Sequence, residues 1–135
     1  MPRAELIFAN VVDTRIKDSH GDGGPSAVYC MSVPGRAVSH HVIRAWKGPQ
    51  GLVNESFSFT APSGKTTYSS PAVTRKLIGM MDVTYFDDVV TDAQFTEAGL
   101  HVASFAIDRE VIGQIEFEVY MQAQAQKLPK ASRTG

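Results

Sequence analysis

The chain has 135 residues, of which 43% are hydrophobic and 20% charged, and its formal net charge is −1. This length suits one domain with a buried core, and the balanced charge excludes a strong electrostatic basis for binding nucleic acid or an anionic membrane. Cys30 is the single cysteine, so no intrachain disulfide can form and a reducing compartment is favoured.

The first ten residues contain an apolar run that is too short and too charged for a signal peptide. No stretch approaches the roughly 20 apolar residues of a membrane span. The sequence therefore predicts a cytoplasmic protein with no membrane partner, or a virion protein if the chain belongs to a viral particle.

Taken in chain order, short segments rich in β-forming residues alternate with turn signals. Residues 18–25 form a loop by composition, and residues 87–97 are expected to be a long connection with room for one helical turn. Pro62-Ser63-Gly64-Lys65 predicts a tight turn, because proline presets φ and glycine accepts a positive φ. The expected strands before the last hairpin are residues 5–13, 26–33, 38–47, 54–61, 66–70, 71–78 and 82–86.

Residues 98–120 predict a β-hairpin around Asp108-Arg109. The second half alternates, with one predicted inner face made of Val111, Gly113, Ile115, Phe117 and Val119. A two-residue turn places Ile107 opposite Glu110 and Leu100 opposite Phe117, although Arg109 is not the glycine that such turns prefer. A three-residue loop therefore stays open as an alternative.

The same register places Phe105 opposite Ile112 on the outer face, next to Ile107. A Phe–Ile pair on a solvent face has two interpretations. One is an ordinary cross-strand contact worth roughly 0.2–1 kcal/mol. The other is a contact patch, made of Phe105, Ile107 and Ile112, that another chain or the C-terminal tail covers.

Seven to eight short strands without a long amphipathic helix predict an all-β fold, an antiparallel β-sandwich. We expect a single domain over residues 1–121, followed by a basic C-terminal tail or arm over residues 122–135. No internal repeat and no second domain is visible in the sequence.

Three segments resemble the immunoglobulin-like sandwiches of small uncharacterised bacterial proteins. They are Pro-Ser-Gly-Lys at 62–65, Phe-Thr-Glu-Ala-Gly-Leu-His-Val at 95–102, and Ile-Asp-Arg-Glu-Val-Ile-Gly-Gln-Ile-Glu-Phe-Glu-Val at 107–119. The resemblance covers mainly residues 55–120 and implies an immunoglobulin-like fold, with no catalytic residues to carry over. The chain departs from that pattern at Arg109, where glycine is usual, and in the loop at 18–25.

Asp18, His20 and Asp22 are the candidate metal ligands, because they alternate along one glycine-rich stretch. A calcium loop needs more oxygen ligands at stricter spacing, so the alternative is a loop whose aspartates bind local backbone. His40 and His41 are adjacent on an expected strand and must point to opposite faces, so they cannot chelate one ion together.

The other reactive side chains fit core positions better than a site. Cys30 with a distant histidine and aspartate satisfies the list for a thiol nucleophile, but a cysteine in a strand is usually a small core residue. Trp46, Tyr68 and Tyr85 could form a sugar-stacking platform, although scattered aromatics in a sandwich are normally core.

The sequence thus predicts a non-enzymatic binding or structural module without a cofactor, acting through protein–protein contacts or self-association. One alternative is a component of a larger particle such as a phage tail or capsid. The other is a metal-dependent enzyme that uses the 18–22 loop.

Overall fold

The computed structural model describes residues 4–121, so the predicted tail at 122–135 lies outside the described residues. The described part contains eleven strands, one short helix and one 3-10 turn. In chain order they are β1 (Glu5–Asp13), α1 (Thr14–His20), η1 (Gly21–Gly23), β2 (Ala27–Cys30), β3 (Gly35–Arg36), β4 (His40–Lys47), β5 (Gly51–Thr60), β6 (Thr66–Ser69), β7 (Val73–Leu77), β8 (Thr84–Val90), β9 (Gln94–Phe95), β10 (Gly99–Ile107) and β11 (Glu110–Met121).

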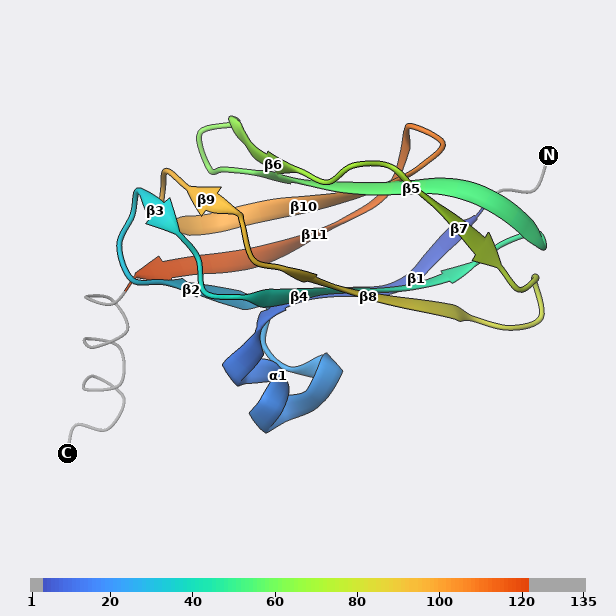
Figure 1. The fold of residues 1–135 in the computed structure, drawn as a ribbon, viewed down its shortest axis with the longest axis horizontal. Helices are drawn as coiled ribbons and strands as arrows, with labels where there is room; N and C mark the ends of the chain where they lie inside the picture. Colours follow the sequence, from blue (N-terminus) through green and yellow to red (C-terminus); the bar gives the residue numbers. More distant parts are fainter. Residues whose placement is uncertain (1–3, 122–135) are drawn as a thin grey trace.

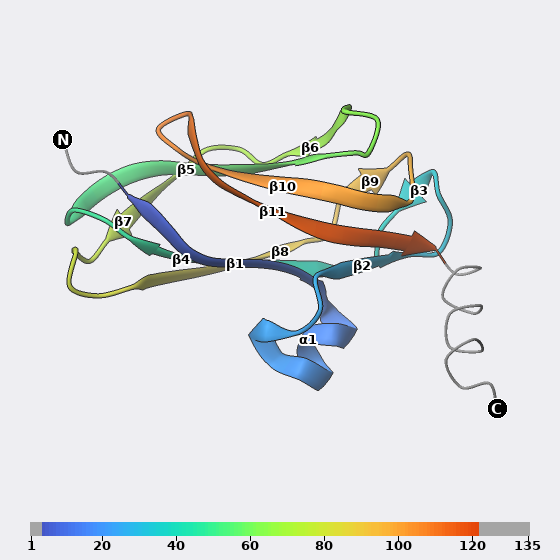
Figure 2. The same ribbon diagram turned by 180° about the vertical axis from the view of Figure 1, so that it is seen from behind.

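The strands lie in two layers with the core between them (Figures 1 and 2). One layer contains β5, β6, β10 and β11, and the other contains β1, β2, β4 and β8. Hydrogen-bonded neighbours follow the order β6-β5-β10-β11-β2-β1-β4-β8, and β7 pairs with β5 beside this path. The β11–β2 pairing joins the layers along one side. On the other side β6 and β8 end the path, so no strand pairing among the described residues closes the two layers there.

The predicted all-β class is confirmed, but the purely antiparallel arrangement is wrong. β2 runs parallel to β1 and also to β11. A parallel pair needs a crossover connection, usually with a helix. Here α1 and η1 supply it: the Asp13 side chain caps α1 by accepting from the Ile16 N–H at 3.0 Å. The segment predicted as a loop at 18–25 therefore begins inside a helix.

Among residues 4–121 no helix is long and apolar enough to span a bilayer.

The two-residue turn at Asp108-Arg109 is confirmed. Ile107 pairs with Glu110, and both turn residues adopt positive φ, 51° and 73°. This is the conformation that a type I′ hairpin turn requires. Two hydrogen bonds to β5 hold it: the Asp108 N–H donates to the Asn54 carbonyl at 2.8 Å, and the Asn54 N–H donates to Asp108 Oδ1 at 2.9 Å.

A register shift between Phe105 and Ala106 changes the faces of this hairpin. Phe105 pairs with Gly113 instead of Ile112, so Phe105 points into the core and is fully buried. Gly113 leaves the room for this arrangement, because a Cβ atom there would lie 2.6 Å from Leu6 Cδ2. Val111, predicted on the inner face, is instead 55% exposed, whereas Phe117 is buried as predicted.

Aromatic side chains, among them Phe95 of β9, pack together in one part of the core. The strands β3 and β9 lie side by side at one end of the sandwich (Figure 1). Phe59 lies 4.9 Å from Phe117 and 6.0 Å from Phe95, measured between ring centroids. Phe95 belongs to β9, which lies in the stretch predicted as a long connection at 87–97. In the structure β8 extends into that stretch as far as Val90, and β9 follows as a separate short strand.

Candidate functional site: a buried charged cluster beside an open cleft

Outside the aromatic part around Phe59, Phe95 and Phe117, the core contains charged side chains. Alternate residues of β4 point inward, and His40, Val42, Arg44 and Trp46 are all fully buried. Arg44 therefore projects its guanidinium between the layers. Its Nε donates to Glu55 Oε2 at 2.8 Å, its Nη2 donates to Glu55 Oε1, and its Nη1 donates to the Val42 carbonyl at 2.7 Å.

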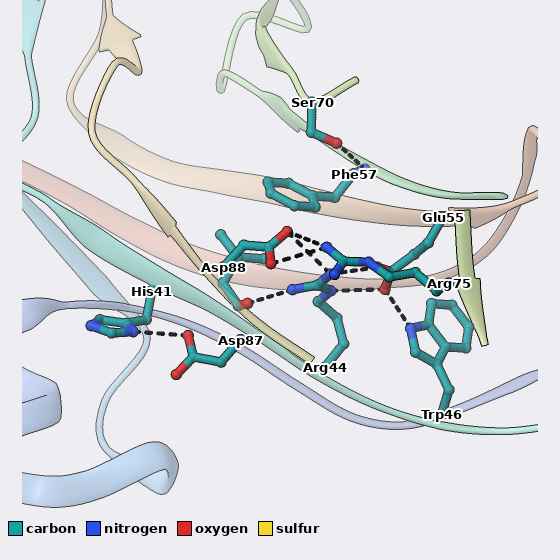
Figure 3. A network of polar contacts seen from close by, with 10 residues as sticks. His41, Arg44, Trp46, Glu55, Phe57, Ser70, Arg75, Asp87 and Asp88 are labelled. Carbon is teal, nitrogen blue, oxygen red and sulfur yellow. Dashed lines mark hydrogen bonds and ion pairs between the residues drawn. The ribbon is translucent and has the colours of Figure 1, made fainter. Parts of the chain in front are cut away.

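Glu55 comes from β5, in the opposite layer, and is also buried. Its Oε2 accepts a second hydrogen bond, from Trp46 Nε1 at 2.6 Å (Figure 3). One carboxylate thus receives two donors of the Arg44 fork and the indole N–H. This bidentate, charge-assisted geometry is the stronger class of protein hydrogen bond.

A second ion pair lies toward the solvent side of this cluster. Arg75 of β7 donates from Nη2 to both oxygens of Asp88 of β8, at 2.7 and 3.0 Å. Asp88 Oδ2 also accepts from Arg44 Nη2 at 3.4 Å, and Arg75 Nε lies 3.3 Å from Glu55 Oε1. That last approach is an ion pair without hydrogen-bond geometry, since Arg75 Nε is buried with no hydrogen-bond partner in residues 4–121.

Aromatic rings enclose the two guanidinium groups. Arg44 Cζ lies 5.3 Å from the Phe57 ring centroid, and Arg75 Cζ lies 4.9 Å from the Phe86 ring centroid. Cations over aromatic faces gain roughly 0.5–2 kcal/mol, depending on desolvation. The charged cluster, defined as Arg44, Trp46, Glu55, Arg75 and Asp88, therefore links both layers at the side where strand pairing does not.

An open cleft of about 310 Å³ adjoins the charged cluster. Phe57 and Ser70 lie above it and Asp87 and Asp88 below it in Figure 3. The full lining comprises Phe57, Tyr68, Ser70, Pro71, Val73, Asp87, Asp88, Val89 and Val90. Burial is the main cause that raises the Tyr68 pKa, with Asp92 and Asp88 adding to it, so this hydroxyl stays protonated near neutral pH.

The charged side chains of the cluster are occupied by one another. In the charged cluster two arginines face two carboxylates, and each carboxylate accepts hydrogen bonds from these partners. Arginine does not deprotonate in proteins, so it cannot act as a general base. Cys30, the candidate thiol nucleophile, is buried, and burial raises its pKa to about 11, which leaves little thiolate.

The structure separates the predicted metal ligands. Asp18 and His20 lie on α1 and Asp22 on η1, all exposed. Asp22 Oδ1 binds Lys17 Nζ at 2.9 Å, and His20 Nδ1 shares a hydrogen with Ser19 Oγ at 2.9 Å. Within residues 4–121 no three histidine, cysteine or acidic side chains lie close enough to hold one ion.

The predicted contact patch is misplaced. Phe105 is fully buried, 6.4 Å from the Phe57 ring, Ile107 is 7% exposed, and Ile112 is half-buried against the core. The register shift before Ala106 is the reason, since each one-residue slip in a strand exchanges its two faces. The prediction of a partner surface centred on Phe105, Ile107 and Ile112 therefore loses its structural basis.

His40 and His41 do point to opposite faces. His40 is buried inside, whereas His41 lies on the outer face, where its Nδ1 is 2.8 Å from Asp87 Oδ1 (Figure 3). The remaining aromatic candidates also separate: Trp46 belongs to the charged cluster, Tyr68 lines the cleft, and Tyr85 is 68% exposed on β8. They form no common stacking platform.

Sequence reasoning missed the charged cluster. The available signal was Arg44 on the same predicted strand face as Val42 and Trp46, because a charged residue on an apolar face is rarely buried without a partner. Its partners Glu55, Arg75 and Asp88 lie on three other strands, with no spacing that links them to Arg44 in the sequence.

Comparison with known proteins shows a fold relationship alone. No protein-family model and no curated protein matches the chain. Among solved structures it is similar to an alkylpurine DNA glycosylase, AlkC, of Pseudomonas fluorescens bound to DNA with an abasic site analogue (TM-score 0.56, 10% identity, 88% of this chain and 31% of the glycosylase). It is also similar to a β-glucosidase of Listeria innocua (TM-score 0.52, 14% identity, 88% of this chain and 16% of that one).

A smaller protein of Pseudomonas aeruginosa, described as immunoglobulin-like, matches over 87% of this chain and 96% of its own, with 12% identity and a TM-score of 0.46. The present chain spans less than a third of the glycosylase and of the β-glucosidase.

Proposed function

We propose that this chain is an immunoglobulin-like, non-enzymatic binding or structural module that acts through contact with another protein. The observation that carries the proposal is the edge of β8. In the described part of the chain β8 pairs with β4 alone, so the backbone N–H and C=O groups along its other edge are available. An extended segment of a partner can add to such an edge as a further strand.

Strand β8 carries few of the devices that protect edges from pairing. Its register with β4 is continuous, without a bulge, and it contains neither proline nor lysine. On the outward face Tyr85 is 68% and Val89 is 54% exposed, which offers apolar side chains next to the free edge. The open cleft lies on the inward side of the same strand.

The fold comparison is compatible with a module inside larger chains. The glycosylase and the β-glucosidase contain this fold as a minor part of their length. The glycosylase structure includes DNA, but a DNA contact is not favoured for the present chain, because the charged side chains that line its cleft are Asp87 and Asp88. A component of a larger particle is the alternative proposal, since the same edge could pair with further copies.

A library of random linear peptides, selected against the full chain, tests the proposal. We expect selected peptides to bind the wild type and to lose most binding to Tyr85→Lys/Val89→Lys, which adds charge beside the β8 edge. Leu100→Lys is the matched control, because Leu100 is 49% exposed on β10 in the other layer. Equal binding to all three proteins would contradict the β8 surface. Sedimentation of the full chain separates the particle alternative, which requires large assemblies.

A further inference from the structure

Two fully buried histidines, His40 and His101, flank Phe95 in the core. His40 Nδ1 lies 2.8 Å from the Val38 carbonyl, and His101 Nδ1 lies 3.0 Å from the Gly99 carbonyl. A carbonyl can only accept, so Nδ1 carries the proton in both rings and Nε2 carries a lone pair. Both Nε2 atoms are buried and lack a hydrogen-bond partner within residues 4–121.

The surroundings of both rings are aromatic. The Phe95 centroid lies 6.2 Å from the His40 ring and 5.1 Å from the His101 ring, the latter edge-on at 90°. Phe59 lies 6.0 Å from His40, and Phe117 lies 5.5 Å from His101. Burial is the largest influence on each imidazole, and it lowers the pKa of both.

Charged groups around the rings only partly offset this burial. Asp13 and Asp92 favour the charged form of His40, and the neighbouring His41 opposes it. Glu97 and Glu118 favour the charged form of His101. None of these side chains is hydrogen-bonded to an Nε2 atom, since both atoms lack such a partner in the described part of the chain.

A small separate sheet lies at one end of the sandwich (Figure 1). In the described part of the chain β3 and β9 pair with each other and with no other strand, through Gly35 with Phe95 and Arg36 with Gln94. The Ala37 N–H donates to the Ala93 carbonyl at 3.1 Å. We call residues 35–37 and 93–95 the cap. Its one large core side chain is Phe95, which is fully buried between the two histidines.

We propose that the cap is an acid-sensitive gate: protonation of His40 and His101 opens it and exposes Phe95 while the rest of the sandwich stays folded. An imidazolium ring has a second N–H, at Nε2, and in the closed state that buried donor would have no acceptor among residues 4–121. Displacing the cap would admit water to both rings, and few backbone contacts oppose it, because its two strands have two residues each and one isolated bridge joins Ala37 to Cys30 of β2. The gate is independent of the proposed contact at β8.

The sign of the effect follows from the lowered pKa values. The closed state binds fewer protons than the open state. Its free-energy advantage over the open state is therefore complete above the ordinary histidine pKa of 6.5 and is lost as the pH falls below that value. If both rings titrate normally when open and stay neutral when closed, the opening equilibrium rises roughly a hundredfold between pH 7.5 and pH 5.5.

Amide hydrogen exchange of the full chain, followed by NMR and corrected for the intrinsic pH dependence, tests the gate. The Ala37 amide reports on the cap. Trp46 fluorescence reports on the whole domain, because Trp46 lies six residues along β4 from His40, roughly 20 Å away. We expect Ala37 exchange to accelerate roughly a hundredfold between pH 7.5 and pH 5.5 with unchanged Trp46 emission.

The double variant His40→Asn/His101→Asn removes both titrating rings. Each asparagine amide can still donate to the Val38 or Gly99 carbonyl but does not titrate. Exposed His20→Asn is the matched control. We expect the double variant to lose the pH dependence and the control to keep it. If the double variant does not fold, each single variant should retain roughly a tenfold response. A pH-independent wild type, a double variant that keeps the response, or Trp46 emission that shifts together with Ala37 exchange would overturn the gate.

Discussion

Replacing Glu55 with glutamine tests the central claim about the charged cluster. Glu55→Gln preserves size but removes the charge that faces buried Arg44, and it disturbs the acceptor of the Trp46 indole. Breaking one partner of a buried ion pair typically costs about 3–5 kcal/mol, because the remaining charge stays desolvated. For a domain of this size that loss corresponds to a melting temperature roughly 10–20 °C lower. Urea and thermal unfolding, followed by Trp46 fluorescence, measure both quantities.

Two further variants make this test decisive. Glu116→Gln makes the same chemical change on an exposed residue of β11 and should stay within about 0.5 kcal/mol of the wild type. Arg44→Met/Glu55→Leu removes both charges and should lose much less stability than the two single changes together, as hydrophobic replacements of buried ion pairs do. A Glu55→Gln protein as stable as Glu116→Gln, or strict additivity in the double variant, would refute the reasoning.

Phe117→Ala should destabilise the domain by about 3–5 kcal/mol, because the ring is buried against Phe59; an unchanged urea midpoint would show that this part of the core is misassigned. Replacing Asp18, His20 and Asp22 together with serine should change the free energy of unfolding by no more than about 1 kcal/mol, because the ion pair between Asp22 and Lys17 is exposed. If elemental analysis finds a metal in the wild type that this variant has lost, the metal-enzyme alternative is supported. At pH 8 Cys30 should react with iodoacetamide at least about a hundredfold more slowly in the folded protein than in urea, since burial raises its pKa from 9.0 to about 11; comparable rates would show that the thiol is accessible.

The last hairpin shows how far a local pattern reaches. The turn at Asp108-Arg109 and the buried position of Phe117 could be predicted, because turn length and period-2 alternation are local properties. The position of Phe105 could not. It depends on a register shift that brings Gly113 under Leu6, and Leu6 is more than a hundred residues earlier in the chain.

Near the start of the chain the local composition predicted the wrong structure. Glycines and aspartates after residue 17 favour a loop by composition, yet Asp13 caps a helix that begins before them. The Asn10 side chain, buried on β1, then donates to the carbonyls of Asp22 and Gly24 at 2.9 and 2.8 Å. This anchoring folds the connection back onto the sheet and makes β2 parallel to β1.

The sequence alone determined the all-β class, most strand positions, the turns at 62–65 and 108–109, and the opposite faces of His40 and His41. These properties follow from alternation and turn chemistry within a few residues. Only the tertiary structure decided the mixed pairing, the charged cluster, and the aromatic enclosure of His40 and His101. Each of these joins residues from strands far apart in the chain, and their free energies depend on burial, which a local pattern does not contain.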